Sequence, residues 1–170
     1  MQSGIVRIQS LRHAFICGLG AFGCFVIFSV TGSDWPQYRG PNRNGVSDEK
    51  GWLDHWPSAG PAVAWRAKVG LGFSSVVVSK GRACTVGHEK GQDTVYCFDA
   101  LTGKPNWQHS YAAELGDKYF EGGTTGTPTF DGDQIYWLSR WGDLFCLEAA
   151  GGKILWSKNV AGETHVPIPM

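Results

Sequence analysis

Short apolar runs separated by turn-forming residues dominate this sequence. Runs of four or five residues that are rich in branched and aromatic side chains are too short for helices and are typical of β-strands. We expect strands over Ser75–Val78, Ala83–Val86, Val95–Phe98, Thr127–Phe130, Gln134–Leu138 and Leu144–Leu147. Neither Val95–Phe98 nor Leu144–Leu147 alternates with polar residues, so the pattern predicts strands that are covered on both faces.

Two segments of the chain, Thr94–Trp107 and Asp143–Trp156, align with each other without a gap. We interpret each as a β-hairpin. An acidic residue accepts backbone N–H groups at the turn, a glycine supplies the positive φ, and a tryptophan packs on the next element. The paired positions are Val95 and Leu144, Cys97 and Cys146, Asp99 and Glu148, Gly103 and Gly152, Lys104 and Lys153, and Trp107 and Trp156.

The spacing of this repeat indicates the fold class. Repeats of 40–50 residues built from short strands are typical of β-propellers. We therefore predict an all-β chain, a partial β-propeller made of four-stranded antiparallel blades. Two blades are expected over about 69–107 and 126–156, and Ala62–Trp65 is expected to be the last strand of an earlier or ring-closing blade. The polar segments His88–Asp93 and Gln108–Gly123 are predicted to be loops, and inter-blade loops often carry binding.

Two motifs resemble a known family. The segment Asp99–Lys104, followed by Trp107, resembles the PQQ-like repeat of quinoprotein-type β-propellers, which is named after pyrroloquinoline quinone. The second copy departs from the repeat at Glu148, Ala150 and Gly151. The segment Asp34–Pro41 resembles the opening signature of exported, stand-alone PQQ-repeat proteins of bacteria. The resemblance covers about residues 34–160 and implies a quinoprotein alcohol dehydrogenase-like propeller.

The first 33 residues have the composition of a targeting segment. Arg7, Arg12 and His13 precede the uncharged apolar run Ala14–Val30. This order predicts either a cleaved signal peptide, which we favour, or an N-terminal membrane anchor, and export in both cases. Residues 34–61 are then predicted to form an N-terminal strap in front of the repeats, which occupy 62–170. In the strap, Arg39 and Arg43 either bind an anion or, as we favour, cross-link the packed strap at the surface.

Charge and length limit the function classes. The 15 basic and 15 acidic residues cancel, which argues against nucleic acid as a partner. A chain of 170 residues ordinarily forms one domain, but two blades cannot close a ring that needs at least about four. We therefore expect the propeller to be incomplete at the C-terminus, so that the chain is the N-terminal portion of a longer protein or assembles with further blades.

The resemblance implies PQQ and Ca²⁺ for an enzyme of this family, with an adjacent cysteine pair at the quinone. The cysteines stand at positions 17, 24, 84, 97 and 146, so none are adjacent. A Cys-x-x-Cys-His haem motif is also absent from the sequence. We therefore predict no catalytic residues in this chain, and the cofactor-binding residues stay unknown. A dehydrogenase would hold its cofactor in blades beyond residue 170.

Other residue types that could carry chemistry have structural interpretations. Four of the five histidines, His55, His88, His109 and His165, lack ligand spacing and are predicted to be exposed loop residues, so no metal site is expected. Asp131-Gly132-Asp133 is expected to be a hairpin turn, since it lacks the further oxygen ligands of a calcium loop. Asp99 and Glu148 are expected to cap equivalent turns rather than act as paired catalytic carboxylates.

The cysteines of the repeats lie in apolar runs. Cys97 and Cys146 are predicted to be buried strand residues. A disulfide between Cys84 and Cys97 on adjacent strands is left open, because the sequence alone does not establish it.

We therefore predict an exported cell-envelope propeller that acts as a binding or scaffold module rather than as an enzyme, similar to the outer-membrane assembly propellers of the family. Its expected partners are further blades or subunits, and an envelope protein or carbohydrate. The alternative is a PQQ-dependent dehydrogenase. Fold-level resemblance does not choose between them.

Overall fold

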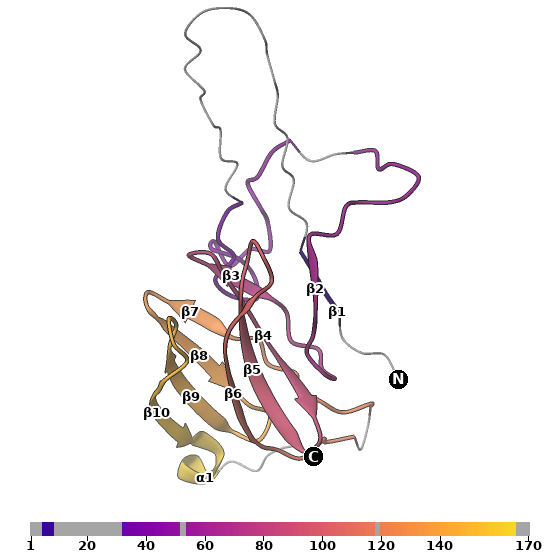
Figure 1. Ribbon diagram of the computed structural model, residues 1–170. Coiled ribbons are helices and arrows are strands. Elements are labelled where there is room, and N and C mark those ends of the chain that lie inside the picture. The colour runs from indigo at the N-terminus through magenta and orange to yellow at the C-terminus, as the bar shows by residue number, and fades with distance from the viewer. Residues whose placement is uncertain (1–4, 9–31, 52–53, 118–119, 166–170) are drawn as a thin grey trace, which may run out of the picture.

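The computed structural model describes residues 5–8, 32–51, 54–117 and 120–165. This part of the chain forms strands and one short helix, arranged as two four-stranded antiparallel sheets and one two-stranded sheet (Figure 1). The two larger sheets lie side by side as blades. The strand order of the two larger sheets confirms the prediction of an all-β, partial β-propeller with four-stranded antiparallel blades.

The first blade has the strand order β3-β4-β5-β6. Its strands are β3 (Val77–Ser79), β4 (Arg82–Glu89), β5 (Gln92–Asp99) and β6 (Pro105–Ala112). The loop predicted over His88–Asp93 does not form. Instead Lys90 and Gly91, both at positive φ (55° and 74°), make a two-residue hairpin turn. The polar His88 and Asp93 lie opposite each other inside the sheet, because each satisfies the other's hydrogen-bonding group.

The second blade has the order β10-β9-β8-β7. Its strands are β7 (Thr129–Asp131), β8 (Gln134–Leu138), β9 (Asp143–Glu148) and β10 (Ile154–Asn159). The predicted turn at Asp131-Gly132-Asp133 joins β7 to β8, with Gly132 at a φ of 60°. After β10 comes the helix α1 (Val160–Thr164), which the apolar pattern did not predict. Asn159 caps this helix by accepting a hydrogen bond from the Gly162 N–H at 2.7 Å.

The strand expected over Ala62–Trp65 is displaced along the chain. Strand β2 (Trp65–Lys68) begins at Trp65, because the alternate positions Trp65, Ala67 and Val69 face the protein while residues 62–64 are exposed. It pairs antiparallel with β1 (Ile5–Ile8), which lies within the predicted targeting segment. The apolar run Ala14–Val30 falls outside the described residues, so the choice between signal peptide and anchor stays a prediction.

The outer strand of the first blade is longer than predicted. Strand β6 continues five residues beyond Trp107 to Ala112, so the segment expected to be a loop from Gln108 becomes irregular only at Ala113. Its residues alternate between exposed and half-buried, which fits an outer strand with one covered face.

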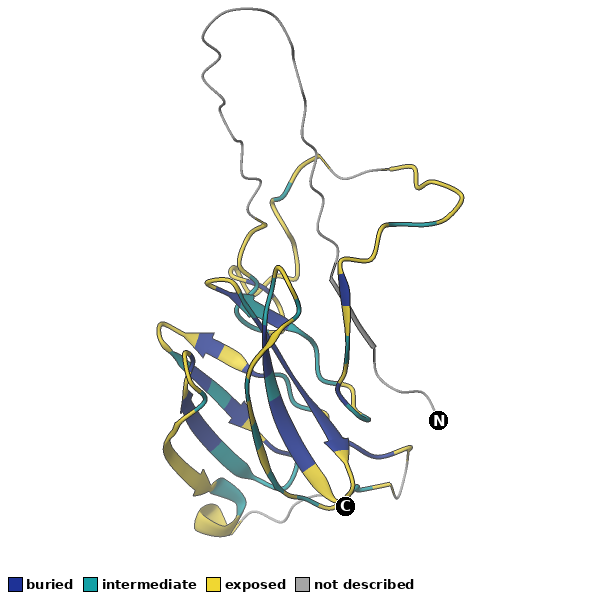
Figure 2. Cartoon of the chain, in the orientation of Figure 1, coloured by how far each residue is buried: buried dark blue, intermediate teal, exposed yellow. Residues whose placement is uncertain are grey.

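Both faces of the first blade are buried, as Figure 2 shows for β4 and β5. One face packs against Trp65 with Ala83 and Phe98. The other face packs against the second blade and forms the main core. This inter-blade core contains Val77, Cys84, Val86, Val95 and Cys97 from the first blade, and Phe130, Ile135, Trp137, Phe145, Leu147 and Ala149 from the second. The prediction that Val95–Phe98 is covered on both faces is therefore confirmed.

The strap at residues 34–61 joins the first strands of both blades. Trp35 and Val78 of β3 exchange backbone hydrogen bonds of 2.8 and 2.9 Å, and the Phe130 N–H of β7 donates to the Pro36 carbonyl at 2.8 Å. The Asp34 carboxylate accepts from the Ser79 hydroxyl and from the Lys80 N–H. The opening signature of the chain therefore holds the two blades together where β3 and β7 meet.

Within the described ranges, no helix has both the length and the apolar character that a membrane span requires.

Candidate binding surfaces

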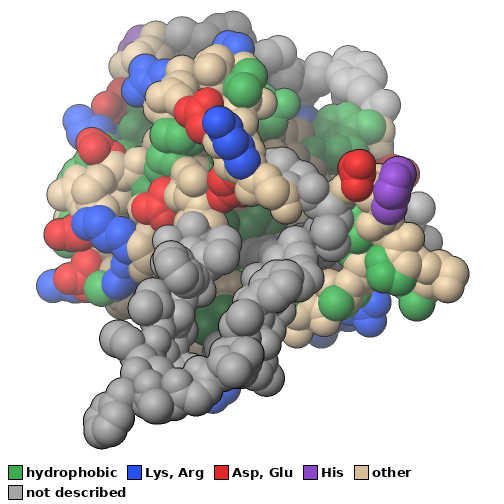
Figure 3. Space-filling model, turned by 90° about the horizontal axis from the view of Figure 1, so that it is seen from above, with side chains coloured by type: hydrophobic (Ala, Val, Ile, Leu, Met, Phe, Trp, Pro, Cys, Tyr) green, Lys and Arg blue, Asp and Glu red, His purple; other side chains and the backbone are tan. Residues whose placement is uncertain are grey.

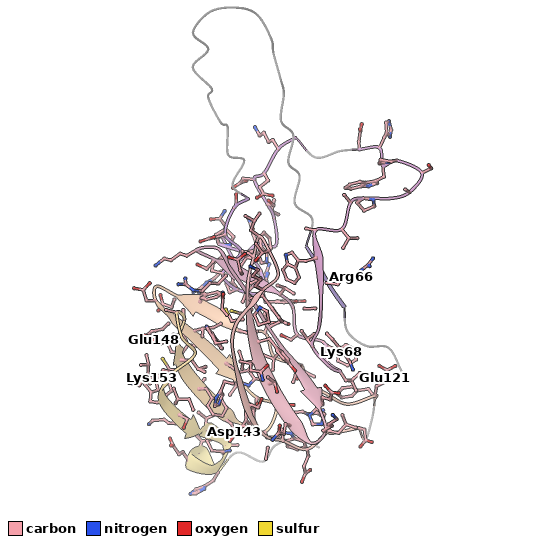
Figure 4. All side chains as sticks on the ribbon, viewed as in Figure 1. Arg66, Lys68, Glu121, Asp143, Glu148 and Lys153 are labelled. Carbon is pink, nitrogen blue, oxygen red and sulfur yellow. The ribbon has the colours of Figure 1, made fainter. Side chains whose placement is uncertain are left out.

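The two ends of the blades carry different connections (Figure 4). We call the end with the turns at 80–81, 99–104, 131–133 and 148–153 the turn end, where Glu148 and Lys153 are labelled. We call the opposite end, with the longer connections 69–76, 113–128 and 139–142, the loop end, where Glu121 and Asp143 are labelled. Seen from above, acidic and basic side chains alternate with hydrophobic ones over the described residues of the turn end (Figure 3).

The first repeated turn is capped by its acidic residue. The Asp99 Oδ1 accepts hydrogen bonds from the hydroxyl and the N–H of Thr102, both at 2.7 Å. These two bonds, the hydroxyl first, hold the pKa of the Asp99 carboxyl below its ordinary value, and the Lys104 charge lowers that pKa further. The backbone closes the turn through the Asp99 N–H, which donates to the Lys104 carbonyl at 2.8 Å.

The second turn keeps the backbone of the first but not its side-chain cap. The Glu148 N–H donates to the Lys153 carbonyl at 2.8 Å, and the Gly152 N–H to the Glu148 carbonyl at 2.8 Å. No group among the described residues donates to the Glu148 carboxylate. The reason is local: the position of Thr102 is occupied by Gly151, which has no hydroxyl. The side chains of Lys104, Lys153 and Glu148 are all exposed.

Each repeated turn receives a tryptophan from the preceding unit. The Trp65 indole N–H donates to the Ala100 carbonyl at 3.0 Å, and the ring lies against Gly103, where an added Cβ would come within 2.5 Å of it. Trp107 makes the same 3.0 Å bond to the Ala149 carbonyl and lies equally close to Gly152. The glycines, at φ of 71° and 70°, therefore allow the chain to turn and also leave room for the tryptophan ring that packs against them.

Trp156 occupies the equivalent place at the end of the second blade, but its face is open. Its side chain is 41% exposed, and its described ring partner is Tyr136 of the same blade, with 6.0 Å between ring centroids. Leu138, 49% exposed, extends this surface, and the whole of β10 is exposed (Figure 2). We call Tyr136, Leu138, Leu144 and Trp156 the open blade face.

The loop end carries a second group of exposed aromatic rings. Phe73, from the connection before β3, is 57% exposed and meets Phe120 edge-on at 5.6 Å. The Arg140 guanidinium lies 5.0 Å from the Phe120 ring and 5.2 Å from the Trp141 ring, within the range of cation–π attraction. We call Phe73, Phe120, Arg140 and Trp141 the loop-end cluster.

Hydrogen bonds hold the connections that carry this cluster. Arg140 Nη1 donates to the Gly116 carbonyl at 2.8 Å, and the Trp141 indole N–H donates to the Glu114 carbonyl at 3.2 Å. The Phe73 N–H donates to the Thr124 carbonyl at 2.7 Å. The cluster is therefore presented by fixed backbone. The sequence analysis missed Phe73, Arg140 and Trp141, although bulky side chains beside glycines in Gly72-Phe73 and Trp141-Gly142 were a usable signal.

A buried polar network lies beneath the loop end. His88 Nδ1 and Asp93 Oδ1 are 2.7 Å apart, and both side chains are almost fully buried. The Tyr111 hydroxyl donates to the other Asp93 oxygen at 3.3 Å and accepts from the Trp137 indole N–H at 2.8 Å. Burial raises the pKa of Tyr111 above its ordinary value, so its hydroxyl keeps its proton. The network links β4, β5 and β6 of the first blade to β8 of the second.

Two of the four histidines were predicted wrongly. His88 is not an exposed loop residue, because it faces Asp93 within the sheet. His109 lies half-buried in β6 beside Tyr111 and Phe145. Its Nε2 is buried and has no hydrogen-bond partner among the described residues, and burial lowers the pKa of His109. His55 and His165 are exposed. By residue type, His88 and Asp93 could act as an acid–base pair. Among the described residues, however, the His88 ring bonds only to Asp93, so no side chain there is placed as a nucleophile for the pair to activate.

The described residues provide no donor set for a metal ion. Nowhere in them do three or more His, Cys, Asp or Glu side chains converge. Asp133 binds Lys80 at 2.8 Å instead, and that bond lowers the pKa of its carboxyl.

The arginines of the strap stand at the surface. Arg39 and Arg43 are exposed, and Arg43 adopts a positive φ of 55° within a tight turn. Their backbone groups hold the turn, with Gly45 N–H donating to the Arg39 carbonyl at 2.9 Å. The guanidinium groups make no hydrogen bond or ion pair with other described residues, so the structure shows no polar cross-link through them.

Comparison with known proteins identifies the type of repeat. Residues 91–169 match the family described as outer membrane protein assembly factor BamB. No curated protein has a significantly matching sequence.

Solved structures include three similar ones. The crystal structure of BamB from Moraxella catarrhalis has 17% sequence identity and a TM-score of 0.45, with 59% of this chain and 28% of that chain covered. For a europium-containing methanol dehydrogenase the identity is 17% and the TM-score 0.43, with 59% and 19% covered. For the quinohemoprotein alcohol dehydrogenase ADHIIG from Pseudomonas putida HK5 they are 19% and 0.40, with 60% and 17% covered. The chain spans less than a third of the length of each.

Proposed function

We propose that this chain, whose repeats are PQQ-like β-propeller blades, is an exported module of the cell envelope that binds other proteins or serves as their scaffold. The family description supports this proposal, since it refers to a factor for the assembly of outer membrane proteins. The sequence supports export, because basic residues precede an uncharged apolar run within the first 33 residues.

The loop-end cluster is the observation that carries the binding role. Aromatic side chains and arginine are the residue types most enriched at the energetic centres of protein interfaces. Here Phe73 and Phe120 expose their rings, while Arg140 and Trp141 are held by backbone carbonyls, so the surface is ordered before it binds. Preorganisation lowers the entropic cost of association. We propose this cluster as the contact for an envelope partner.

Binding of the purified protein to the envelope fraction of the producing bacterium tests this proposal. We expect saturable binding, weakened about ten-fold or more by the double substitution Phe73→Ser and Phe120→Ser. Leu101→Ser is the matched control, because Leu101 is also 57% exposed but lies in the 99–104 turn at the turn end. Equal binding by all three proteins would contradict the role of the loop-end cluster, and no saturable binding by the wild type would contradict the scaffold function.

A second proposed contact is a further blade on the open blade face. The rings of Trp65 and Trp107 both pack on the turn of the next unit. In each case the indole N–H donates to an Ala carbonyl, and a positive-φ glycine lies against the ring. Trp156 repeats the position without such a seat among the described residues. We propose that another blade of the same kind, from this protein or from a second subunit, supplies it. An exposed apolar sheet face of this kind is otherwise a liability for solubility.

The alternative function is a PQQ-dependent dehydrogenase with its cofactor site in other blades. It is favoured only by the type of repeat. Thermal unfolding of the propeller assembled with those other blades, with and without PQQ and Ca²⁺, separates the two functions, because a ligand at 100 times its Kd stabilises the folded state by about 2.7 kcal/mol. We expect no shift of the midpoint. A rise of several degrees that requires both PQQ and Ca²⁺ would support the dehydrogenase instead.

A further inference from the structure

Two buried cysteines face each other across the central strands of the first blade. Cys84 in β4 and Cys97 in β5 are direct partners in the antiparallel register. Both have zero exposed surface and lie in the inter-blade core. In the structure their thiols are reduced. A disulfide between them requires backbone positions that bring the two sulfur atoms close enough to bond.

The register of β4 and β5 determines which type of pair Cys84 and Cys97 form. The two-residue turn Lys90-Gly91 makes the flanking pair Glu89 and Gln92 a hydrogen-bonded pair, and pair types alternate along an antiparallel ladder. Counting from that pair, Cys84 and Cys97 fall on a non-hydrogen-bonded pair. At the other end of the strands the Ala100 N–H donates to the Gly81 carbonyl, as the same alternation of pair types requires.

Non-hydrogen-bonded pairs bring side chains closer together. Their Cα atoms are about 4.5 Å apart, which is within the range of 4.4–6.8 Å that disulfides span. The alternative pair type would place the Cα atoms about 5.5 Å apart, with the side chains farther from each other. The separation that this pair type gives is therefore compatible with a bond between the two sulfurs.

The chemical surroundings agree with this geometry. Burial is the main cause that raises the pKa of the Cys84 thiol, and its contact with the Cys97 thiol adds to the rise. Two thiols that are fully buried in a core with Val77, Val86 and Val95 react slowly once the blade is folded. Oxidation must then take place while the hairpin is still open to solvent.

The second blade offers an internal comparison. Cys146 corresponds to Cys97 in the repeat and is equally buried. Its partner on the neighbouring strand is Tyr136, and its thiol donates to Gln134 Oε1 at 3.6 Å. Among the described residues Cys146 therefore has no second thiol beside it, although its burial is the same.

We infer that Cys84 and Cys97 form a disulfide that staples β4 to β5 during export, while Cys146 stays a thiol. Both S–H bonds break and one S–S bond forms, and the two protons end on the dithiol that is formed from the accepting disulfide. The two electrons pass by thiol–disulfide exchange to a protein disulfide of the export compartment, which becomes a dithiol. The supply of that oxidant rests on the proposed export; the geometry of the pair does not.

The test is to refold the full chain in a mixture of reduced and oxidised glutathione, unfold it in acid, and alkylate it without reductant. Trypsin separates the three cysteines of the repeats into the peptides Ala83–Lys90, Gly91–Lys118 and Trp141–Lys153. Mass spectrometry is expected to find the first two joined and the third alkylated. The variant Cys84→Ser is expected to leave Cys97 alkylated, whereas Cys146→Ser is expected to retain the joined pair.

Thermal unfolding of the folded protein gives a second measurement. The bridge closes a loop of about 15 residues, so its reduction is expected to lower the midpoint by about 10 °C. Alkylation of both Cys84 and Cys97 in protein that has refolded with its native circular dichroism would overturn the inference. A joined pair after refolding but free thiols in protein isolated from cells would overturn only the proposed export.

Discussion

The repeated turn assigns different tasks to residues that look equivalent in sequence. Asp99 caps its turn through Thr102, whereas Glu148 caps nothing because Gly151 replaces the threonine. The glycines keep their task in both copies. A glycine is required here twice over, first for its positive φ and second because a tryptophan ring lies where a side chain would begin.

The substitution Gly103→Ala tests the seat of Trp65. An alanine at a φ of 71° costs about 1–2 kcal/mol, and its Cβ at 2.5 Å from the indole adds about 1–3 kcal/mol of overpacking. Gly132→Ala is the control, because Gly132 has a φ of 60° but no atom within 4 Å of an added Cβ. Urea unfolding should show the larger loss for Gly103→Ala. Equal losses would mean that the tryptophan seat contributes nothing.

Asp99 makes a pH-dependent contribution to stability. Its pKa is lowered in the folded state, so the contribution is present above the unfolded pKa of about 4 and is lost as the pH falls through the folded value. We expect Asp99→Asn to destabilise the protein at neutral pH, and the difference from the wild type to shrink as the pH falls through the folded pKa of Asp99. Urea unfolding across this range measures the difference. Thr102→Ala should reduce it, since the hydroxyl that donates to Asp99 is lost.

The strands of the two blades are joined by a polar network as well as by apolar packing. Tyr111 of β6 is central, because its hydroxyl bonds both Asp93 of β5 and Trp137 of β8. Its ring also packs on Phe145 of β9, with 4.7 Å between centroids. Tyr111 therefore connects its own strand, β6, to the three strands β5, β8 and β9. These contacts fix the register of one blade relative to the other.

The substitution Tyr111→Phe keeps the ring and removes the hydroxyl. The buried Trp137 indole N–H then loses its acceptor, which costs about 1–3 kcal/mol in the free energy of unfolding. Tyr136→Phe is the control, since the Tyr136 hydroxyl bonds Gln134 on the less buried open blade face. Chemical denaturation should rank Tyr111→Phe as clearly the more destabilising change. A neutral Tyr111→Phe would show that water replaces the hydroxyl.

The whole molecule is asymmetric in burial. The first blade is covered on one side by Trp65 and its neighbours and on the other by the second blade. The second blade is covered on one side only, and its open blade face leaves Trp156 and Leu138 in solvent. Blades obtain their stability from adjacent blades, so this face is where the proposed further blade contributes most.

Sedimentation velocity tests the open blade face directly. We expect the purified chain to self-associate, because Trp156 and Leu138 are 41% and 49% exposed on one sheet face. Trp156→Ser should shift the distribution toward monomer, and Leu101→Ser at the turn end should leave it unchanged. A wild-type chain that is monomeric and stably folded at all concentrations would contradict the need for a further blade.

Local pattern was sufficient for the class of fold and for the hairpins. Short apolar runs, the turn Asp131-Gly132-Asp133 and the glycines at 103 and 152 report on the nearest few residues, and strand and turn propensities act over that range. The same range explains the error at His88–Asp93, because polar residues indicate a loop unless a partner on the opposite strand satisfies them.

The binding surfaces depended on contacts between residues far apart in the chain. Phe73, Phe120 and Arg140 come from three connections that meet only when the blades pack, and Trp107 reaches its seat at Gly152 across the blade boundary. The pairing of Cys84 with Cys97 required the register of the hairpin, and a shift of one residue would have placed the two thiols on opposite faces. Such contacts are set by the packing of whole blades, and sequence periodicity contains no record of them.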